Sequence, residues 1–362
     1  MERRSFLKGA AAGTAVGGAA AFPAPAIAQQ RFEWKMLTTW PKNFPGLGTG
    51  AQRLADAITA ASDGRLTVKL YAAGELVPAF EVFDAVRQGN AECGHDAAYY
   101  WVNKNKSTPF FCTVPGGLTA QEQNGWLYYG GGQELWDELY AEFGLRAWAA
   151  GSSGCQMGGW FQKEINSIAD FNGLTMRIPG LGAEVINRLG ATAVNMPGGE
   201  IMPALQSGVI DATEWVGPWN DLAFGFYKVA KYYYGPGFHE PGSTLSLMVN
   251  LEAYEKLPKD LQEIVRRCAA AENTITLSEF SAANARALDT LVNKHNVQVR
   301  HFPDDVFRAM MKHSLDVVAE TASEGDINKR IYESWIKFRK ESMSWAPLAD
   351  NGYMNNRALL SA

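Results

Sequence analysis

The chain has 362 residues, of which 47% are hydrophobic and 20% charged, and its formal net charge is −5. This balance is typical of a globular protein, and the length favours two domains over a single core. No basic cluster follows the first residues, so nucleic-acid binding is not indicated. The four cysteines are widely spaced, which excludes C-x-x-C zinc and iron–sulfur patterns and leaves open whether any of them pair. We expect buried free thiols at Cys93, Cys112, Cys155 and Cys268.

Residues 1–28 have the pattern of an export signal. Two arginines at positions 3 and 4 precede an apolar Ala/Gly run, and the small residues at 26–28 are typical of a cleavage site. Twin arginines followed by Ser-Phe-Leu-Lys are typical of twin-arginine export. A membrane anchor is disfavoured, because Pro23 and Pro25 interrupt the run. Cleavage after residue 28 removes three basic residues and one acidic residue, so the expected periplasmic chain has a net charge of −7.

Strand and helix patterns alternate through the first half of the mature chain. A strand–helix–strand–helix–strand order predicts a parallel sheet with crossover helices. The expected strands are 32–40, 65–71, 91–97, 145–150 and 156–161, and the expected helices are 47–61, 79–88, 120–129 and 133–143.

In the second half, the stretch "GLTMRIPG" at 173–180 predicts a strand that ends at Pro179-Gly180 and leads into a helix. Residues 258–296 have helical spacing without Gly or interior Pro, which predicts one long helix of about ten turns. The other expected elements are helices at 183–189, 200–206, from 303 onward and at 331–345, and strands at 209–218 and 243–250. Two α/β halves followed by helices predict a two-lobed protein whose ligand lies in the cleft between the lobes.

Arg177 lies near the C-terminal end of the 173–180 strand, where ligands bind in open α/β sheets. Its planar guanidinium can hold a ligand carboxylate by two parallel hydrogen bonds. An arginine paired with a neighbouring carboxylate for structural reasons is the alternative.

Three further polar residues are candidates, each with an ordinary structural alternative. Gln156 precedes Gly158 and Gly159, and glycines within a strand often mark a close approach of backbone or ligand; the alternative is a bulge with a solvated glutamine. Glu214 comes late in an apolar strand and needs a partner if it is buried, or else lies on an exposed edge. Glu240 lies in a Gly/Pro-rich loop, where a solvated glutamate is usual.

Aromatic and histidine residues give weaker signals. Five aromatics either line a pocket or belong to the core: Tyr100, Trp160, Trp215, Trp219 and Phe238. The five histidines have no metal-ligand spacing and form no recognisable nucleophile set with a serine or cysteine.

Four stretches together carry a resemblance over essentially the whole mature chain: "AAGELVP", "GCQMGGWFQKEINSIADFNGLTMRIPG", "ALQSGVIDATEWVGP" and "KVAKYYYGPGFHEPGST". They resemble the solute-binding proteins of tripartite ATP-independent periplasmic (TRAP) transporters. The similarity is greatest to the subgroup that binds 2-oxo acids such as pyruvate, or lactate, together with a metal cation.

The resemblance implies a type II-like periplasmic binding protein with a long interlobe helix. It also implies delivery of the ligand to a membrane permease and a homodimer. We expect lobe I at 29–152 plus 217–257, lobe II at 153–216 plus 258–330, and a C-terminal dimerisation arm at 331–362.

The resemblance also implies residue roles. Arg177 matches the arginine that binds the ligand carboxylate, and Gln156 matches a residue that contacts both ligand and cation. Glu214, Glu240 and the backbone carbonyl of Trp215 match the remaining cation ligands, and Trp215 also borders the ligand. Tyr100 matches an aromatic residue that hydrogen-bonds or packs on the ligand. Met157 stands where some relatives have asparagine, and Phe238 where some have bulkier aromatics, so the sequence does not fix the preferred ligand.

The charges of this residue set favour a bound cation. A ligand carboxylate, Arg177 and two glutamates sum to −2, which repels an anionic ligand and raises a glutamate pKa. One Na⁺ brings the sum to −1 and one Ca²⁺ brings it to zero. Ligands that are all oxygens suit these hard cations, and the choice between Na⁺ and Ca²⁺ stays open.

Other functions remain as alternatives. The same fold could bind another organic acid, a sugar acid or a polyol. An exported periplasmic oxidoreductase is the rival class, since twin-arginine signals often export cofactor-bearing proteins. The sequence has no G-x-G-x-x-G after the first strand and no C-x-x-C-H, so an enzyme is not expected. A lyase that uses the metal site is a weaker rival.

Overall fold

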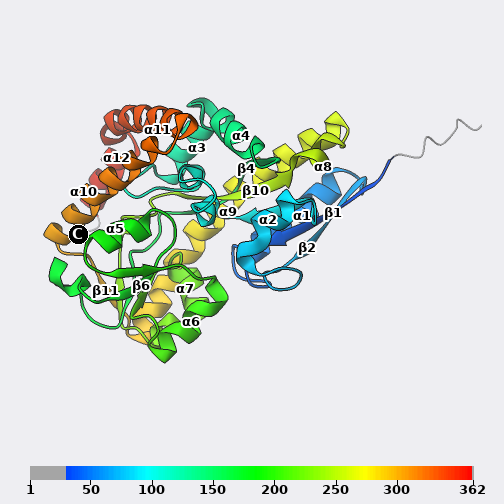
Figure 1. The fold of residues 1–362 in the computed structure, drawn as a ribbon. Coiled ribbons are helices and arrows are strands. Elements are labelled where there is room, and N and C mark those ends of the chain that lie inside the picture. The colour runs from blue at the N-terminus through cyan, green and yellow to red at the C-terminus, as the bar shows by residue number, and fades with distance from the viewer. Residues whose placement is uncertain (1–29, 361–362) are drawn as a thin grey trace, which may run out of the picture. The chain divides into compact units, whose positions relative to one another are not determined.

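A computed structural model of the protein describes residues 30–360. The expected export signal, residues 1–28, lies outside the described residues. The chain divides into residues 1–30 and residues 31–362. The second unit is a mixed α/β structure built on two sheets (Figure 1).

The first sheet has the strand order β2-β1-β3-β10-β4. Its strands are β1 (Phe32–Thr38), β2 (Leu66–Tyr71), β3 (Cys93–Asp96), β4 (Leu145–Gly154) and β10 (Ser243–Asn250). β1 pairs in parallel with β2 and β3, as the alternation of strands and helices predicted, and α1 (Gly48–Ala61) and α2 (Val82–Arg87) form the crossovers. β10 runs antiparallel between β3 and β4, so the sheet is mixed.

The second sheet has the order β11-β9-β5-β8-β6-β7 and is made of very short strands. They are β5 (Gly159–Phe161), β6 (Thr175–Arg177), β7 (Thr192–Val194), β8 (Ala212–Thr213), β9 (Tyr232–Tyr234) and β11 (Gln298–Arg300). The helices α5 (Gly182–Arg188) and α6 (Gly198–Ser207) connect β6 to β7 and β7 to β8. The strand expected at 209–218 was wrong in extent: only two residues pair, because the chain then turns toward α7 (Pro218–Phe224), which begins at a proline.

Two extended connections join the sheets. Residues 155–158 lead from β4 to β5, and residues 235–242 lead from β9 back to β10. The two connections bond to each other: Gln156 N donates to Glu240 O at 2.9 Å, and Gly237 N donates to Gln156 O at 2.8 Å. The segment 217–257, which we expected in lobe I, supplies β9 to the second sheet and β10 to the first. The lobe boundaries stay a prediction.

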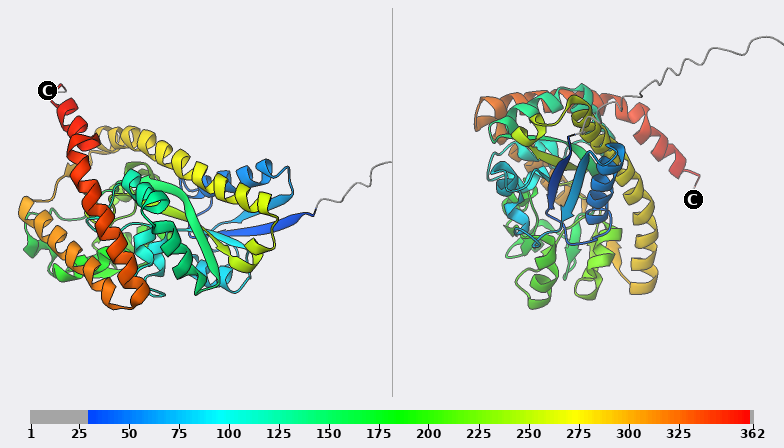
Figure 2. Two further views of the ribbon diagram at one scale, coloured as in Figure 1. Left: turned by 90° about the horizontal axis from the view of Figure 1, so that it is seen from above. Right: turned by 90° about the vertical axis from the view of Figure 1, so that its right-hand side faces the viewer.

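A single long helix, α9 (Lys259–His295), has 37 residues and packs on β4, α1 and α7 (Figure 2). Its length agrees with the absence of Gly and interior Pro from this part of the sequence. It ends at Asn296, which adopts the left-handed conformation at φ 56° that commonly terminates helices.

The remaining helices are α3 (Ala120–Tyr129), α4 (Gly132–Ala141), α8 (Leu251–Glu255), α10 (Asp304–Glu320), α11 (Asp326–Trp345) and α12 (Asp350–Ala358). Of these, α10, α11 and α12 lie in the C-terminal part and the others lie earlier in the chain. Short 3₁₀ turns occupy Ala79–Glu81, Ala98–Trp101, Thr108–Phe111, Ile168–Phe171, Phe226–Lys228, Thr321–Ser323 and Ala346–Leu348. α11 packs on α3 and α4 and has Ile331 and Trp335 buried, whereas its end and α12 project outward (Figure 2). Between residues 30 and 360, none of the helices combines the length and the apolar character needed to cross a membrane.

All four cysteines are free. Cys93 and Cys112 are buried, as expected, and Cys268 is half-buried. The expectation was wrong for Cys155, which is exposed. Neighbouring side chains of an extended segment point to opposite sides, and the next residue, Gln156, points inward with 3% exposure.

Candidate functional site

Arg177 and Glu214 meet at the carboxyl ends of two neighbouring parallel strands. β6 ends at Arg177, which pairs in register with Thr213, the last residue of β8. Glu214 follows, and its backbone N donates to Arg177 O at 3.1 Å. The expected position of Arg177 at a strand end is therefore confirmed, at the sheet edge where α/β proteins bind ligands.

The Arg177 side chain is 1% exposed and bonded on three sides. Nη1 donates to Glu214 Oε1 and, at 3.1 Å, to Glu214 O, and Nε donates to Met196 O at 3.2 Å. The guanidinium lies 5.1 Å from the centre of the Trp215 ring. Burial is the largest effect and opposes the charge, but Glu214, Tyr100, Tyr99 and Glu240 together more than offset it, so the pKa of Arg177 is raised above its ordinary value. Nη2 is buried and has no hydrogen-bond partner among the described residues, which leaves one donor for a ligand.

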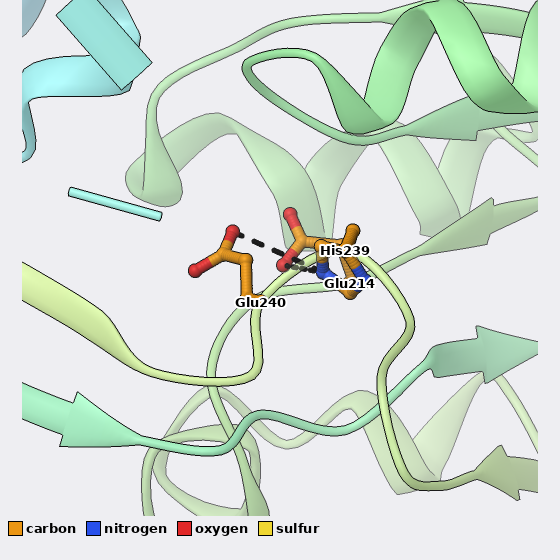
Figure 3. Close-up of side chains that lie close together, drawn as sticks. All are labelled: Glu214, His239 and Glu240. Atoms are coloured by element: carbon orange, nitrogen blue, oxygen red, sulfur yellow. Dashed lines mark hydrogen bonds and ion pairs between the residues drawn. The ribbon is translucent and has the colours of Figure 1, made fainter. Parts of the chain in front are cut away.

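Glu214, His239 and Glu240 form a buried cluster at this point (Figure 3). One atom of each side chain that could bind a metal ion lies within 4.8 Å of the corresponding atoms of the other two. His239 Nε2 is 3.2 Å from Glu214 Oε2 and 3.9 Å from Glu240 Oε1. Because a carboxylate only accepts, Nε2 donates to Glu214. Sequence reasoning missed His239, although its place beside Glu240 in a Gly/Pro-rich loop was an available signal.

Glu240 is 2% exposed and Glu214 is fully buried, so the alternatives of a solvated loop glutamate and an exposed edge glutamate are wrong. Ser243 Oγ donates to Glu240 Oε2. Burial, followed by the nearby Glu214 carboxylate, raises the pKa of Glu240 well above its ordinary value. The neighbourhood thus disfavours two ionised glutamates side by side.

Gln156 is also buried, and the alternative of a solvated bulge is wrong. Its Nε2 donates to Ser153 Oγ at 3.0 Å and to Ser243 Oγ at 3.2 Å, so Ser243 links Gln156 to Glu240. Gln156 Oε1 is a buried acceptor that no described residue satisfies. A Cβ on Gly159 would lie 2.8 Å from the backbone O of Thr213, which agrees with the close backbone approach expected at these glycines, whereas a Cβ on Gly158 would lie 2.6 Å from the Phe302 ring.

A small cavity of about 10 Å³ borders this site at Gln156 and Trp215, with about the space that one water occupies. Its polar lining is Ser153 and Gln156, and its aromatic lining is Trp40, Tyr99, Tyr100 and Trp215. A three-carbon acid is larger than this, so its entry requires the lining side chains to move.

Tyr100 and Trp215 are thus at the cavity, as expected. Burial raises the pKa of Tyr100 above its ordinary value, so the phenol stays neutral and keeps its O–H donor. Trp215 Nε1 is buried without a partner among residues 30–360. The other candidate aromatics, Trp160, Trp219 and Phe238, pack mainly on other aromatic rings: Trp160 stacks on Tyr233 at 4.0 Å, Trp219 lies 5.3 Å from Phe280, and Phe238 lies 5.2 Å from His239.

The chemistry of the site is that of paired opposite charges. One guanidinium has a spare donor, and an amide oxygen and two carboxylates lie close by. Such a set suits an anion at the arginine and a cation among the oxygens.

A family model described as bacterial extracellular solute-binding protein, family 7, matches residues 37–324. A curated relative, the monocarboxylate 2-oxoacid-binding periplasmic protein of Nostoc sp., is 43% identical over 322 residues, which cover 89% of this chain and 88% of the relative.

Solved TRAP periplasmic solute-binding proteins have the same fold. The protein from Pseudoalteromonas atlantica, with bound sodium and pyruvate, is 40% identical, covers 90% of this chain and 99% of its own, and gives a TM-score of 0.87. The protein from Colwellia psychrerythraea, with bound calcium and pyruvate, is 41% identical, covers 90% of this chain and 100% of its own, and also gives 0.87. The protein from Bordetella bronchiseptica, a dimer with calcium and picolinate, is 36% identical. The match covers 92% of this chain and 98% of its own, and gives a TM-score of 0.90. These matches confirm the expected two-lobed α/β fold, and the chain belongs to family 7 of the bacterial extracellular solute-binding proteins, together with the TRAP solute-binding proteins.

Proposed function

We propose that the protein captures a small 2-oxo or 2-hydroxy monocarboxylate, pyruvate-like or lactate, with one bound Na⁺ or Ca²⁺ ion, and delivers it to a membrane TRAP permease. The relatives that share about 40% of its sequence bind pyruvate with sodium or with calcium. No bond of the ligand is made or broken in this function, so the protein is not an enzyme.

The observation that carries the proposal is the buried Arg177. Its Nη2 donor has no partner within residues 30–360, and a buried donor left unpaired is costly. A ligand carboxylate satisfies it with a charge-assisted hydrogen bond. Tyr100 and Trp215, which line the adjacent cavity, contact the rest of the ligand in this arrangement.

The residues present fit a hard cation. Gln156 Oε1 is an unsatisfied buried acceptor, and Glu214, Glu240 and the Trp215 carbonyl complete an oxygen set. His239 donates to Glu214 and so orients that carboxylate. A cation held by these oxygens would supply positive charge that offsets the two glutamates and would favour acids that carry an oxygen on C2.

Capture requires the two lobes to close over the ligand. The extended connections 155–158 and 235–242, together with α9, are the proposed hinge, since they join the parts of the chain that carry the two sheets. The site residues lie on or next to these connections, so closure and binding are coupled. Export through the twin-arginine pathway to the periplasm completes the proposal.

We further propose that the protein is a homodimer that packs through its C-terminal arm. The segment from the end of α11 to just past α12 exposes large apolar side chains that nothing in residues 30–360 covers: Met343, Trp345, Leu348, Tyr353, Met354 and Leu359. Such a patch is typical of a protein–protein interface. The relative from Bordetella bronchiseptica is a dimer.

A thermal-shift screen tests the function. The mature protein is heated with pyruvate, lactate, longer 2-oxo acids, dicarboxylates, sugar acids and polyols, each with Na⁺, with Ca²⁺ and with neither. We expect the melting temperature to rise with 2-oxo or 2-hydroxy monocarboxylates when a cation is present, because a ligand that binds only the native state stabilises it. Calorimetry should then give one ligand per chain, recovered unchanged. No response to any monocarboxylate, or turnover of the bound acid, would overturn the proposal.

A further inference from the structure

One wall of the cavity is held from behind by a histidine that is not part of the ligand and cation site. Trp40 lines the cavity, and its Nε1 donates to Nδ1 of His95 at 2.9 Å. His95 Nε2 lies 3.2 Å from Ala150 O. Both side chains are almost completely buried.

The partners of His95 fix its protonation. An indole N–H only donates, so Nδ1 must accept and carry no proton. A backbone carbonyl only accepts, so Nε2 carries the proton. Burial lowers the pKa of His95 to about 4, so the ring stays neutral near pH 7 and keeps this arrangement.

The Ala150 carbonyl is available because of an irregularity in β4. In the pairing of β10 with β4, Leu245 lies opposite Gly151 and Ser246 opposite Ala149, so the register skips Ala150. Such a bulge leaves its extra residue outside the ladder and re-aims it. β4 leads on to Ser153 and Gln156, so His95 ties Trp40 to the strand that carries the polar lining.

Trp40 is also held at its backbone and its ring. Two hydrogen bonds fix its backbone: Trp40 N donates to Thr38 Oγ1 at 3.0 Å, and Trp40 O accepts from Ala73 N at 2.9 Å. The ring centre lies 6.1 Å from that of Tyr100 and 6.4 Å from that of Trp215. The indole therefore has no alternative position while its Nε1 is bonded to His95.

The polar and apolar linings of the cavity set the direction of a ligand. Ser153 and Gln156 supply the polar lining, and Arg177 lies 5.1 Å from the centre of the Trp215 ring, which also borders the cavity. The apolar lining includes Leu47, Leu245 and Trp40. A 2-oxo acid whose carboxylate and C2 oxygen bind at Arg177 and Gln156 thus places its alkyl group against this apolar lining, of which Trp40 is part.

We propose that His95 is a positioning residue that holds Trp40 as a fixed wall and thereby limits the length of the alkyl group that the site accepts. The inference rests on the proposed function, because it takes a 2-oxo monocarboxylate as the ligand. It predicts a preference for pyruvate over 2-oxobutyrate and 2-oxovalerate.

Calorimetry with these three acids, at a fixed cation concentration, tests the proposal in the wild type and in the variants His95→Leu, His95→Gln, Trp40→Phe and Trp40→Phe/His95→Leu. Leucine cannot accept from the indole, so the ratio of the 2-oxovalerate Kd to the pyruvate Kd should fall about tenfold, the scale of methylene discrimination in apolar pockets. Glutamine can both accept and donate, so His95→Gln should keep the wild-type ratio. Trp40→Phe should lower the ratio as well, and adding His95→Leu to it should change the ratio no further.

The indole ¹H–¹⁵N resonance of Trp40, identified by its absence in Trp40→Phe, gives a second readout that needs no ligand. It should move in His95→Leu and stay in place in His95→Gln. The proposal is overturned if that resonance is unchanged in His95→Leu, if the ratio is unchanged there while Trp40→Phe alters it, or if the wild type does not distinguish the three acids. Failure of the proposed function looks different: the wild type then binds none of the three acids, and both inferences end.

Discussion

The Nε2 atom of His239 lies 3.2 Å from Oε2 of Glu214, while Arg177 donates to the other oxygen of the same carboxylate. Glu214 is therefore fixed from both sides, by an imidazole N–H and by a guanidinium. This places the carboxylate at the junction of the proposed anion and cation positions, with Arg177 on one side and Glu240 on the other. The first two predictions concern these two positions.

Arg177→Lys should weaken pyruvate binding by at least about thirtyfold, which corresponds to about 2 kcal/mol. Lysine keeps the positive charge but cannot bond Glu214, Met196 and a ligand carboxylate through one rigid fork. Calorimetry measures the affinity, and the melting temperature of the ligand-free variant reports whether the fold is kept. Arg300→Lys is the matched control, because Arg300 lies in the same sheet and pairs with Glu164 away from the cavity. Equal affinities of Arg177→Lys and the wild type would remove Arg177 from the site.

Removal of Na⁺ and Ca²⁺ should lower the affinity for pyruvate at least about fivefold, because occupation of one of two coupled sites commonly changes the affinity of the other by at least this factor. By reciprocity, pyruvate should raise the affinity for the cation by the same factor. Titrations in buffers with an organic cation alone, with Na⁺ and with Ca²⁺ measure both. Glu240→Gln keeps an acceptor for Ser243 but loses the negative charge, so it should reduce the dependence on the cation. Glu164→Gln, at the protein surface, should not. Affinities that are the same in all three buffers would exclude a coupled cation.

Gly198→Ala should weaken ligand binding about tenfold, the scale of an overpacked contact. A Cβ at Gly198 would lie 2.5 Å from a ring atom of Trp215, so the ring must shift into the cavity or away from Arg177. The next residue, Gly199, gives a matched control, since a Cβ there meets nothing within 4 Å. Pyruvate affinities of the two alanine variants, compared with their melting temperatures, separate a change at the site from a general loss of stability. If both variants bind like the wild type, the Trp215 ring does not limit the ligand.

The sequence predicted best the features that repeat along the chain. Arg177 was placed at a strand end because Pro-Gly follows an apolar run, and α9 was expected because 37 residues pass without a helix breaker. The three-residue strands β7, β9 and β11 were missed, since so short a segment has no measurable alternation. They become strands only because neighbouring chain segments offer them backbone partners.

The burial of the site could not be predicted for a similar reason. A glutamate in a Gly/Pro-rich loop is usually solvated, and only the pairing of residues 155–158 with 235–242 buries Glu240. The hydrogen bond of Trp40 to His95 joins positions 55 residues apart and depends on the order of the strands in the sheet. The sequence around Trp40 and the sequence around His95 do not contain that information. Residue type pointed to Arg177, Gln156 and the glutamates, and the position of His239 beside Glu240 was a signal that we did not use, whereas Trp40 needed the tertiary structure.

Removal of residues 343–362 should convert the proposed dimer into a monomer without loss of pyruvate binding. The deletion takes away the exposed apolar end of α11 and all of α12, but it leaves Ile331 and Trp335, which pack into the core. Sedimentation velocity over a range of concentrations measures the mass, and calorimetry measures the affinity. A double substitution, Trp345→Ser with Leu348→Ser, should act in the same direction on the intact chain. A full-length chain that sediments as a monomer would contradict the dimer and leave the ligand site unaffected.

Asp221 should contribute a fall in the stability of the protein as the pH rises from about 4 to about 7, opposite in sign to His95, whose lowered pKa contributes a rise between about 4 and 6.5. This carboxylate is buried and accepts from Tyr233 Oη at 2.7 Å, Trp160 Nε1 at 2.9 Å and Val216 N at 3.3 Å. Burial nevertheless raises its pKa from 3.8 to about 7. Between these two values the folded state holds a proton that the unfolded state has lost, so each step up in pH favours unfolding, and the effect ends above the folded pKa.

The free energy of unfolding, measured with urea, should therefore fall less steeply with pH in Asp221→Asn than in the wild type over the same interval. Burial raises the pKa of Asp96 to about 6, so Asp96 also contributes to the fall in stability with pH, in both proteins alike. The difference between the two slopes therefore isolates Asp221. Asp304→Asn changes a carboxylate that is 94% exposed and should keep the wild-type slope. Because Asp221 also anchors the backbone next to Trp215, Asp221→Asn should lower pyruvate affinity more than Asp304→Asn does. Identical slopes for Asp221→Asn and the wild type would mean that Asp221 is already ionised in the folded protein near pH 4.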